Sequence, residues 1–289
     1  MHSPSTLFSL ALLLAPGCAT PEPVSSPMHT AHETALSQRL RGLASRAPLI
    51  VAHRGASASH PENTLPAFSA GLDDGAAIVE LDFRQARDGT LVCLHDQTID
   101  RTTDGAARFG RDRVAVDTLS LAELDALDAG SWKGSAFAGV RVPTLRQALQ
   151  TIQPRGITMI EHKSGDAAAL VELLRDGGWT EDVIVQSFDW EWLSELRRLA
   201  PTLTLGALGS NRLTADDLAR LDALGVSLVH WEAEDLTLED LRALEARGFL
   251  TCVYTVDDDL GLLGAIGAGL SAITTDVPAR LRKIIDDRG

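Results

Sequence analysis

Short apolar runs alternate along this chain with segments of helical periodicity, and this alternation is the feature that most constrains its fold. The apolar runs, which we expect to be strands, lie near 48–53, 77–83, 157–161, 183–187, 203–207, 226–231, 249–255 and 271–275. The helical segments lie at 64–75, 144–153, 166–177, 190–199, 214–224, 237–247 and 258–268. Strands that alternate with helices indicate repeated β-α units and a parallel sheet. Because eight such strands close into a barrel, the sequence predicts an α/β fold, a (β/α)8 TIM barrel.

The segment 97–143 interrupts this alternation after the second predicted strand. It contains a short helical stretch, SLAELDAL (120–127), followed by a loop rich in glycine and alanine. With 289 residues and 45% apolar content, the chain is long enough for one large domain. We therefore predict a barrel domain over 47–286 with a short insertion at about 97–143. Long insertions at the carboxyl end of barrel strands commonly shape the entrance to a site.

The first 46 residues differ in composition from the rest. Residues 7–15 (LFSLALLLA) form a short apolar run, which is followed by Cys18 and then by a tract rich in proline, serine and threonine. This pattern predicts a signal peptide with a lipobox at 1–18, cleaved before Cys18, and a flexible tether with an N-terminal helix at 19–46. The protein would then be exported as a membrane-anchored lipoprotein of the bacterial cell envelope. A cleaved secretory signal and a cytoplasmic chain with a misassigned start are the alternatives.

The chain is strongly acidic, with a formal net charge of −14. Nucleic acids and anionic lipids select basic surfaces, so this charge argues against both as main partners. Beyond the N-terminal region no apolar stretch is long enough to span a bilayer, and membrane contact is expected only through the anchor at Cys18. Cys93 and Cys252 lie inside apolar runs and are expected to be buried, unpaired thiols. The sequence gives no prediction of the oligomeric state.

The second predicted strand, IVELDF (78–83), carries two carboxylates. Glu80 and Asp82 are two residues apart, so in a strand both project from the same face as Ile78. Two carboxylates repel each other strongly in a pocket of low dielectric, and oxygen ligands suit Mg²⁺ or Ca²⁺. An exposed edge strand with a solvated acidic face would give the same pattern. Two histidines and an arginine nearby favour the metal site.

The two histidines each follow an apolar, β-prone run. His53 comes after PLIVA and is followed by Arg54 and Gly55, while His95 comes after TLVCL and is followed by Asp96. Glycine allows a sharp turn, which would place His53 and Arg54 at a strand end. A single histidine at a strand end is more often structural. Two of them beside one acidic strand form a candidate acid/base pair, because imidazole titrates near neutral pH.

Eleven short motifs occur in one order along the chain. They are HRG (53–55), PENT (61–64), E-x-D (80 and 82), DGTLVCLHD (88–96), RTTDG (101–105), DAGSW (128–132), VPTLRQAL (142–149), E-x-K (161 and 163), VQSFD (185–189), VYTVDD (253–258) and ITTDVP (273–278). In order and spacing they resemble the glycerophosphodiester phosphodiesterase family. The resemblance extends from about 45 to 285 and rests on all the motifs together, since each alone is weak.

The resemblance implies roles for the residues that match its motifs. The general acid and base would be His53 and His95. Arg54 would bind the phosphate, and one divalent cation, Ca²⁺ or Mg²⁺, would be held by Glu80, Asp82 and Glu161.

Other matching residues would support these. Lys163, on the same strand face as Glu161, would face the phosphoryl oxygens, although a lysine that reaches solvent from a strand end is the alternative. Glu62 would orient Arg54 or a metal-bound water, and Gln186 would lie nearby at another strand end. We expect a bracing role for the turn after His95 from Asp96, Arg101 and Asp104.

Two positions depart from the family pattern. Tyr254 stands where the family commonly has tryptophan, and its smaller ring is expected to pack on the substrate's glycerol with altered specificity for the alcohol. His162 replaces a more usual aliphatic residue. By strand alternation it points away from the site and should pack behind the barrel.

The resemblance implies a phosphoric diester hydrolase that converts glycerophosphodiesters, with a metal ion, to glycerol 3-phosphate and an alcohol. One alternative keeps the scaffold and cleaves lysophospholipids in the manner of a lysophospholipase D, with Trp132, Phe137 and Val140 lining an acyl-chain groove. The other is a lipid-anchored protein that binds phosphodiesters without turnover.

Overall fold

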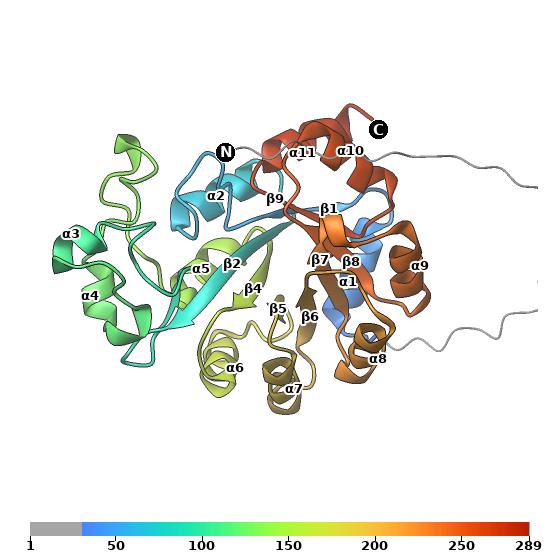
Figure 1. The fold of residues 1–289 in the computed structure, drawn as a ribbon, viewed down its shortest axis with the longest axis horizontal. Helices are drawn as coiled ribbons and strands as arrows, with labels where there is room; N and C mark the ends of the chain where they lie inside the picture. Colours follow the sequence, from blue (N-terminus) through green and yellow to red (C-terminus); the bar gives the residue numbers. More distant parts are fainter. Residues whose placement is uncertain (1–30, 289) are drawn as a thin grey trace, which may run out of the picture.

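The computed structural model describes residues 31–288, which form a closed barrel of parallel strands surrounded by helices (Figure 1). The barrel strands are β1 (Leu49–Ala52), β2 (Ile78–Gln85), β4 (Ile157–His162), β5 (Val183–Ser187), β6 (Thr204–Gly209), β7 (Leu228–Glu232), β8 (Leu250–Tyr254) and β9 (Ala272–Thr275). The barrel closes because β1 pairs in parallel with both β2 and β9. The predicted TIM barrel is confirmed, and each predicted strand overlaps one of these eight.

Helices surround the barrel and also cover one end of it. They are α1 (Ala35–Ala44), α2 (Leu65–Asp73), α5 (Leu145–Ile152), α6 (Ala167–Gly177), α7 (Trp190–Leu199), α8 (Ala215–Leu224), α9 (Leu238–Ala246), α10 (Asp259–Gly267) and α11 (Pro278–Asp286). The seven predicted helical segments correspond to α2 and α5–α10, whereas α11 was not predicted. Across residues 31–288 we find no helix with the length and apolar character needed to cross a membrane. The predicted signal peptide and Cys18 lie outside the described residues.

Side chains inside the barrel change from apolar to polar along the strands. At the amino-terminal ends they form a buried apolar cluster that also includes Leu36 and Leu40 of α1. This cluster contains Val51, Ile78, Ile157, Met159, Ile184, Leu228, Leu250, Cys252 and Ala272. Alternate residues of a strand face the same side, so the next inward positions lie nearer the carboxyl ends. Buried polar residues occupy them, namely Glu80, Glu161, Gln186, His230 and Thr274.

A ninth strand, β3 (Leu91–Cys93), precedes the insertion, runs antiparallel to the end of β2 and was not among the predicted strands. Residues 97–143 then form α3 (Gly105–Phe109), α4 (Leu121–Asp125) and short 3₁₀ turns, beside the end of β2 in Figure 1. The insertion has its own buried apolar cluster, which includes Ile99, Leu124 and Val142. It is therefore a packed element that presents its residues to the barrel in fixed positions. Cys93 and Cys252 are buried and free, as expected.

Candidate active site

The predicted site residues collect at the carboxyl ends of three neighbouring barrel strands. His53 and Arg54 directly follow β1, Glu80 and Asp82 lie on β2, and Glu161 and Lys163 lie at and just beyond the end of β4. The parallel register places Asp82 opposite Glu161. His95 follows β3, which pairs with the end of β2. The barrel thus brings together residues that the sequence separates widely.

The turn after β1 depends on an unusual backbone conformation. Arg54 and Gly55 both have positive φ angles, of 56° and 84°. A Cβ atom on Gly55 would lie 2.4 Å from the backbone of Ala67 in α2. Only glycine fits at this position, as the sequence suggested, and the turn directs His53 and Arg54 to the carboxyl end of the barrel.

Glu80, Asp82 and Glu161 form a buried carboxylate triad. One oxygen atom from each lies within 4.8 Å of the others. Within the described residues, Glu80 Oε1 is buried and has no hydrogen-bond partner, whereas Asp82 Oδ1 and Glu161 Oε1 face the ammonium group of Lys163. Burial, with repulsion from Asp82, raises the pKa of Glu80 to about 8 and that of Glu161 to about 7. Three hard carboxylate oxygens this close together, one of them without a partner, fit a divalent cation such as Mg²⁺ or Ca²⁺.

Two cationic side chains flank the triad. Lys163 Nζ lies 3.4 Å from Asp82 Oδ1 and forms an ion pair with Glu161, while Arg54 Nε lies 3.2 Å from Asp82 Oδ2. The Arg54 backbone N–H donates to Glu80 Oε2 at 3.0 Å. Burial alone would raise the pKa of Asp82, but Arg54 and Lys163 outweigh it and hold that pKa below its ordinary value. Two cations beside a metal-binding group are suited to an anionic ligand such as phosphate.

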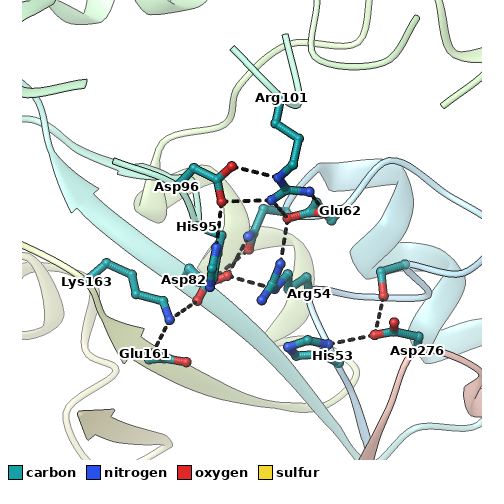
Figure 2. Close-up of polar contacts among 12 residues, drawn as sticks. His53, Arg54, Glu62, Asp82, His95, Asp96, Arg101, Glu161, Lys163 and Asp276 are labelled. Atoms are coloured by element: carbon teal, nitrogen blue, oxygen red, sulfur yellow. Dashed lines mark hydrogen bonds and ion pairs between the residues drawn. The ribbon is translucent and has the colours of Figure 1, made fainter. Parts of the chain in front are cut away.

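His53 is held by a carboxylate from the end of β9. Its Nδ1 lies 2.6 Å from Asp276 Oδ1, which also accepts a hydrogen bond from Ser57 Oγ at 2.8 Å. In Figure 2 the opposite edge of the ring points away from Asp276. Burial acts to lower the pKa of His53, but the Asp276 bond and the Glu80 charge together raise it above 6.5. Asp276 was not predicted as a site residue, although its place in ITTDVP, at a strand end, was a usable signal.

His95 is held in a similar way by its neighbour in sequence. Its Nδ1 lies 2.7 Å from Asp96 Oδ1, and burial lowers the pKa of His95 below its ordinary value. Arg101 donates to both Asp96 and Glu62, and Glu62 accepts from Arg54 Nη1 at 2.8 Å. Glu62 therefore contacts Arg54 as expected. Asp96 and Arg101 were expected to brace the turn, and the structure shows that both also contact residues of the site.

Asn63 is a further residue that sequence reasoning did not identify. Its Nδ2 donates to Asp82 Oδ2 at 2.7 Å, and the Asp82 backbone N–H donates to Asn63 Oδ1 at 3.0 Å. Asn63 has a φ of 56°, a conformation that asparagine tolerates better than most residues. It lies in the PENT motif beside Glu62 and fixes the orientation of Asp82. Asp104 accepts a hydrogen bond from the Asp128 backbone N–H at 2.8 Å, which joins its segment to the loop at Asp128.

Gln186 lies beside Glu161 on the neighbouring strand β5, at a strand end near the triad as expected, whereas Tyr254 lies at the end of β8. Gln186 Oε1 is 2.8 Å from His230 Nδ1, and His230 Nε2 is 3.0 Å from Thr274 Oγ1. Tyr254 OH donates to the Gly209 carbonyl at 2.8 Å, and its ring meets that of His230 edge-on at 5.0 Å. Within residues 31–288 no side-chain hydrogen bond joins Gln186 or Tyr254 to the carboxylate triad. Substrate contact by Tyr254 stays a prediction.

His162 lies outside the barrel interior. Its ring stacks on Trp192 with centroids 3.9 Å apart and also contacts Phe83, and burial lowers its pKa to about 4. The prediction that His162 packs behind the barrel is confirmed.

Comparison with known proteins identifies the family of this chain. The model of the glycerophosphoryl diester phosphodiesterase family matches residues 53–280. A glycerophosphodiester phosphodiesterase of Caldanaerobacter subterraneus subsp. tengcongensis is 33% identical over 248 residues, which cover 83% of this chain and 99% of that protein. One of Bacillus subtilis is 30% identical over 258 residues, which cover 82% and 86%.

Solved structures show the same similarity. An Oleispira antarctica phosphodiesterase, in complex with the product sn-glycerol-3-phosphate, has a TM-score of 0.76 and 30% identity, and the match covers 84% of this chain and 98% of that one. A glycerophosphodiester phosphodiesterase of Agrobacterium tumefaciens has a TM-score of 0.72 and 30% identity, with coverage of 82% and 99%. The chain therefore belongs to the glycerophosphodiester phosphodiesterase family and is a phosphoric diester hydrolase.

Proposed function

We propose that this protein hydrolyses glycerophosphodiesters to glycerol 3-phosphate and an alcohol, with a divalent cation bound by Glu80, Asp82 and Glu161. The observation that carries the proposal is the arrangement of Figure 2, in which two carboxylate-held histidines and two cationic side chains lie around Asp82 and Glu161. The complex of the Oleispira antarctica phosphodiesterase with sn-glycerol-3-phosphate supports the same product here.

The positive charges of the site would bind and neutralise the phosphodiester. A bound divalent cation would act as a Lewis acid that withdraws charge from the phosphoryl oxygens. Arg54 and Lys163 hold the same oxygens and stabilise the additional negative charge of the transition state. Both side chains are fixed by carboxylates, which limits the reorganisation needed during the reaction.

The two histidines would move the protons. Asp276 occupies Nδ1 of His53 and Asp96 occupies Nδ1 of His95, so the Nε2 atom of each ring is available for transfer. One histidine takes a proton from the attacking hydroxyl group, of water or of the glycerol 2-position. The other donates a proton to the oxygen of the leaving alcohol. Attack by water gives glycerol 3-phosphate directly, whereas attack by the glycerol 2-hydroxyl gives a cyclic phosphate that water must then open, with the roles of the histidines exchanged, to give glycerol 3-phosphate.

The test is a panel of glycerophosphodiesters that differ in their alcohol, assayed for release of glycerol 3-phosphate with and without a chelator. We expect release that the chelator abolishes and that Ca²⁺ or Mg²⁺ restores. Release that is insensitive to the chelator contradicts the role of the cation. A diester that binds and survives intact in the presence of Ca²⁺ and Mg²⁺ contradicts hydrolysis and favours a binding protein.

A second candidate function is cleavage of lysophospholipids on their headgroup side. It is favoured by Trp132 of the insertion, a large apolar residue that is 38% exposed. The adjacent Lys133 donates to the Ser57 carbonyl at 2.6 Å, and Ser57 in turn contacts Asp276. The exposed ring is thus close to the residues that hold His53, where it would cover an acyl chain. Choline release that is faster from lysophosphatidylcholine than from glycerophosphocholine supports this candidate.

We also propose that the enzyme acts outside the cytoplasm, as a lipoprotein anchored through Cys18. The apolar run at 7–15 and the tract after Cys18 support this proposal. Mass spectrometry of the mature N-terminus in the native host tests it. A lipid-modified Cys18 is expected, whereas an intact Met1 contradicts export by this route.

A further inference from the structure

The guanidinium of Arg101 joins two carboxylates, each of which holds a different group of the proposed reaction (Figure 2). Its Nε and Nη2 donate to Asp96 at 2.6 and 3.0 Å, and its Nη1 and Nη2 donate to Glu62 at 2.7 and 2.8 Å. Asp96 contacts His95, and Glu62 accepts from Arg54. Resting on the proposed function, we propose that Arg101 is a positioning residue that fixes the proton-transferring His95 and the phosphate-binding Arg54 relative to each other.

The geometry requires that Arg101 act through these carboxylates and not on the substrate. Its four hydrogen bonds occupy both edges of the planar guanidinium, so no edge is left for a phosphate. Two carboxylates bound to one rigid fork have a fixed separation and orientation. A lysine, with a single ammonium group on a flexible stem, cannot impose the same geometry on both.

The backbone that carries Arg101 is itself held in place by a local turn. Thr103 Oγ1 donates to the Ile99 carbonyl at 2.5 Å and accepts from the Gly105 N–H at 3.0 Å. Ile99 is fully buried in the apolar cluster of the insertion. The insertion therefore presents Arg101 to Glu62 and Asp96 from a rigid support, and this contact gives the RTTDG motif a function beyond the turn.

Arg101 is exposed enough for its catalytic and structural contributions to be separated. Its side chain is 45% exposed. Exposed ion pairs contribute little to the free energy of unfolding, so its replacement should change catalysis more than stability. Arg87 offers a matched control: it is 57% exposed, and it donates to Glu123 Oε2 at 2.9 Å and to the Thr118 carbonyl at 2.6 Å, both in the insertion.

The first experiment compares Arg101→Gln, Arg101→Lys and Arg87→Gln in the full chain, with glycerol 3-phosphate release measured at saturating Mg²⁺ or Ca²⁺. We expect Arg101→Gln to lower kcat/KM by roughly 10- to 100-fold, the usual effect of removing a group that orients a functional side chain. Arg101→Lys should recover only part of this loss, and Arg87→Gln should stay within about twofold of the wild type, with similar melting temperatures for all three.

The second experiment separates the effect of Arg101 through Glu62 on Arg54 from its effect through Asp96 on His95. Glu62→Gln, on the phosphate side, should mainly raise KM, whereas Asp96→Asn, on the histidine side, should mainly lower kcat. Arg101→Gln should do both, and the double variant of Arg101→Gln with Asp96→Asn should have a kcat no lower than the worse single variant. A purely structural brace would not divide KM and kcat in this way.

The outcomes distinguish the two proposals. Wild-type release of glycerol 3-phosphate, with Arg101→Gln as active as Arg87→Gln or with fully multiplicative losses in the double variant, overturns the role of Arg101 alone. Absence of release by the wild type overturns the proposed function and, with it, this inference. If Arg101→Gln does not fold, Arg101→Lys combined with Asp96→Asn gives the same cycle.

Discussion

The carboxylate triad on β2 and β4 differs from the neutral polar group on β5, β7 and β9, although both are buried at the same level of one barrel. In the neutral group, Gln186, His230 and Thr274 satisfy one another through two hydrogen bonds. In the triad, Glu80 keeps one buried oxygen atom without a hydrogen bond from the described residues, and Asp82 and Glu161 share the single ammonium group of Lys163. Buried polar groups cost free energy unless they are paired, so the first group stabilises the fold by itself. The second leaves a buried oxygen of Glu80 unpaired among the described residues, and a bound cation would supply its partner.

Burial acts on both groups but with opposite results. It lowers the pKa of His230 to about 3, which leaves a neutral imidazole that its neighbours can satisfy. It raises the pKa of Glu80 to about 8 with help from Asp82, but Arg54 and Lys163 keep Asp82 ionised. The triad therefore cannot become neutral as a whole. A buried carboxylate that the protein keeps ionised beside two carboxyl groups with raised pKa values is a feature of function more than of stability.

Removal of the cation should have the largest effect, because only the triad, and not the neutral polar group, is expected to bind one. We expect chelation to abolish turnover. Without substrate, a cation at about 100 times its Kd should raise the free energy of unfolding by about 2.7 kcal/mol, seen as a rise in melting temperature. Glu80→Gln should lose that rise. Glu232→Gln, which changes an exposed carboxylate at the end of β7, is the control and should keep it. Equal cation-dependent shifts in the two variants contradict the metal site.

Loss of either histidine should have the next largest effect. We expect His53→Ala and His95→Ala each to lower kcat by at least about 10²-fold, the scale of lost acid/base catalysis, without loss of folding. The His162→Gln variant is the control, because this histidine packs outside the barrel. Its kcat per folded molecule should stay close to that of the wild type. Near-normal turnover in both alanine variants would remove the histidines from the mechanism.

Asp276→Asn should have a smaller effect, because it leaves His53 in place and removes only the charge that orients it. A decrease in kcat of roughly 10-fold is expected, with KM little changed. Asp258→Asn serves as control, since Asp258 caps α10 and asparagine caps helices equally well. If the two variants have the same kcat, Asp276 has no part in orienting His53.

The smallest expected effect concerns stability at low pH and tests the neutral group. The folded protein favours neutral His230, whereas the unfolded chain takes up a proton below about pH 6.5, so this stabilisation is complete above pH 6.5 and is lost as the pH falls toward 3. Each decrease of one pH unit in this range should lower the free energy of unfolding by about 1.4 kcal/mol through His230. Urea unfolding of the wild type and of His230→Gln at pH 6.5, 5.5 and 4.5 measures the difference. Parallel pH dependence of the two proteins contradicts it.

Strand periodicity made much of the site predictable from the sequence. Contacts between residues far apart in the sequence could not be predicted in this way. Glu80 and Asp82 could be placed on one face because side chains alternate along a strand, and the same rule placed His162 outside. The contacts of Asp276 with His53 and of Arg101 with Glu62 span 223 and 39 residues of sequence. No local pattern encodes such distances. The hydrogen bonds of His230 with Gln186 and Thr274 could likewise not be predicted, because they form only when β5, β7 and β9 face the same barrel interior.

The pairing of β1 with β9 also sets the order in which the enzyme can become active during its synthesis. His53 depends on the last barrel strand twice, since its backbone N–H donates to the Thr275 carbonyl at 3.0 Å and its ring contacts Asp276. A nascent chain that has emerged only as far as β8 already contains both histidines and the whole triad, but its first histidine still lacks its partner and the barrel still has open edges. The active site is therefore complete only after β9 pairs with β1.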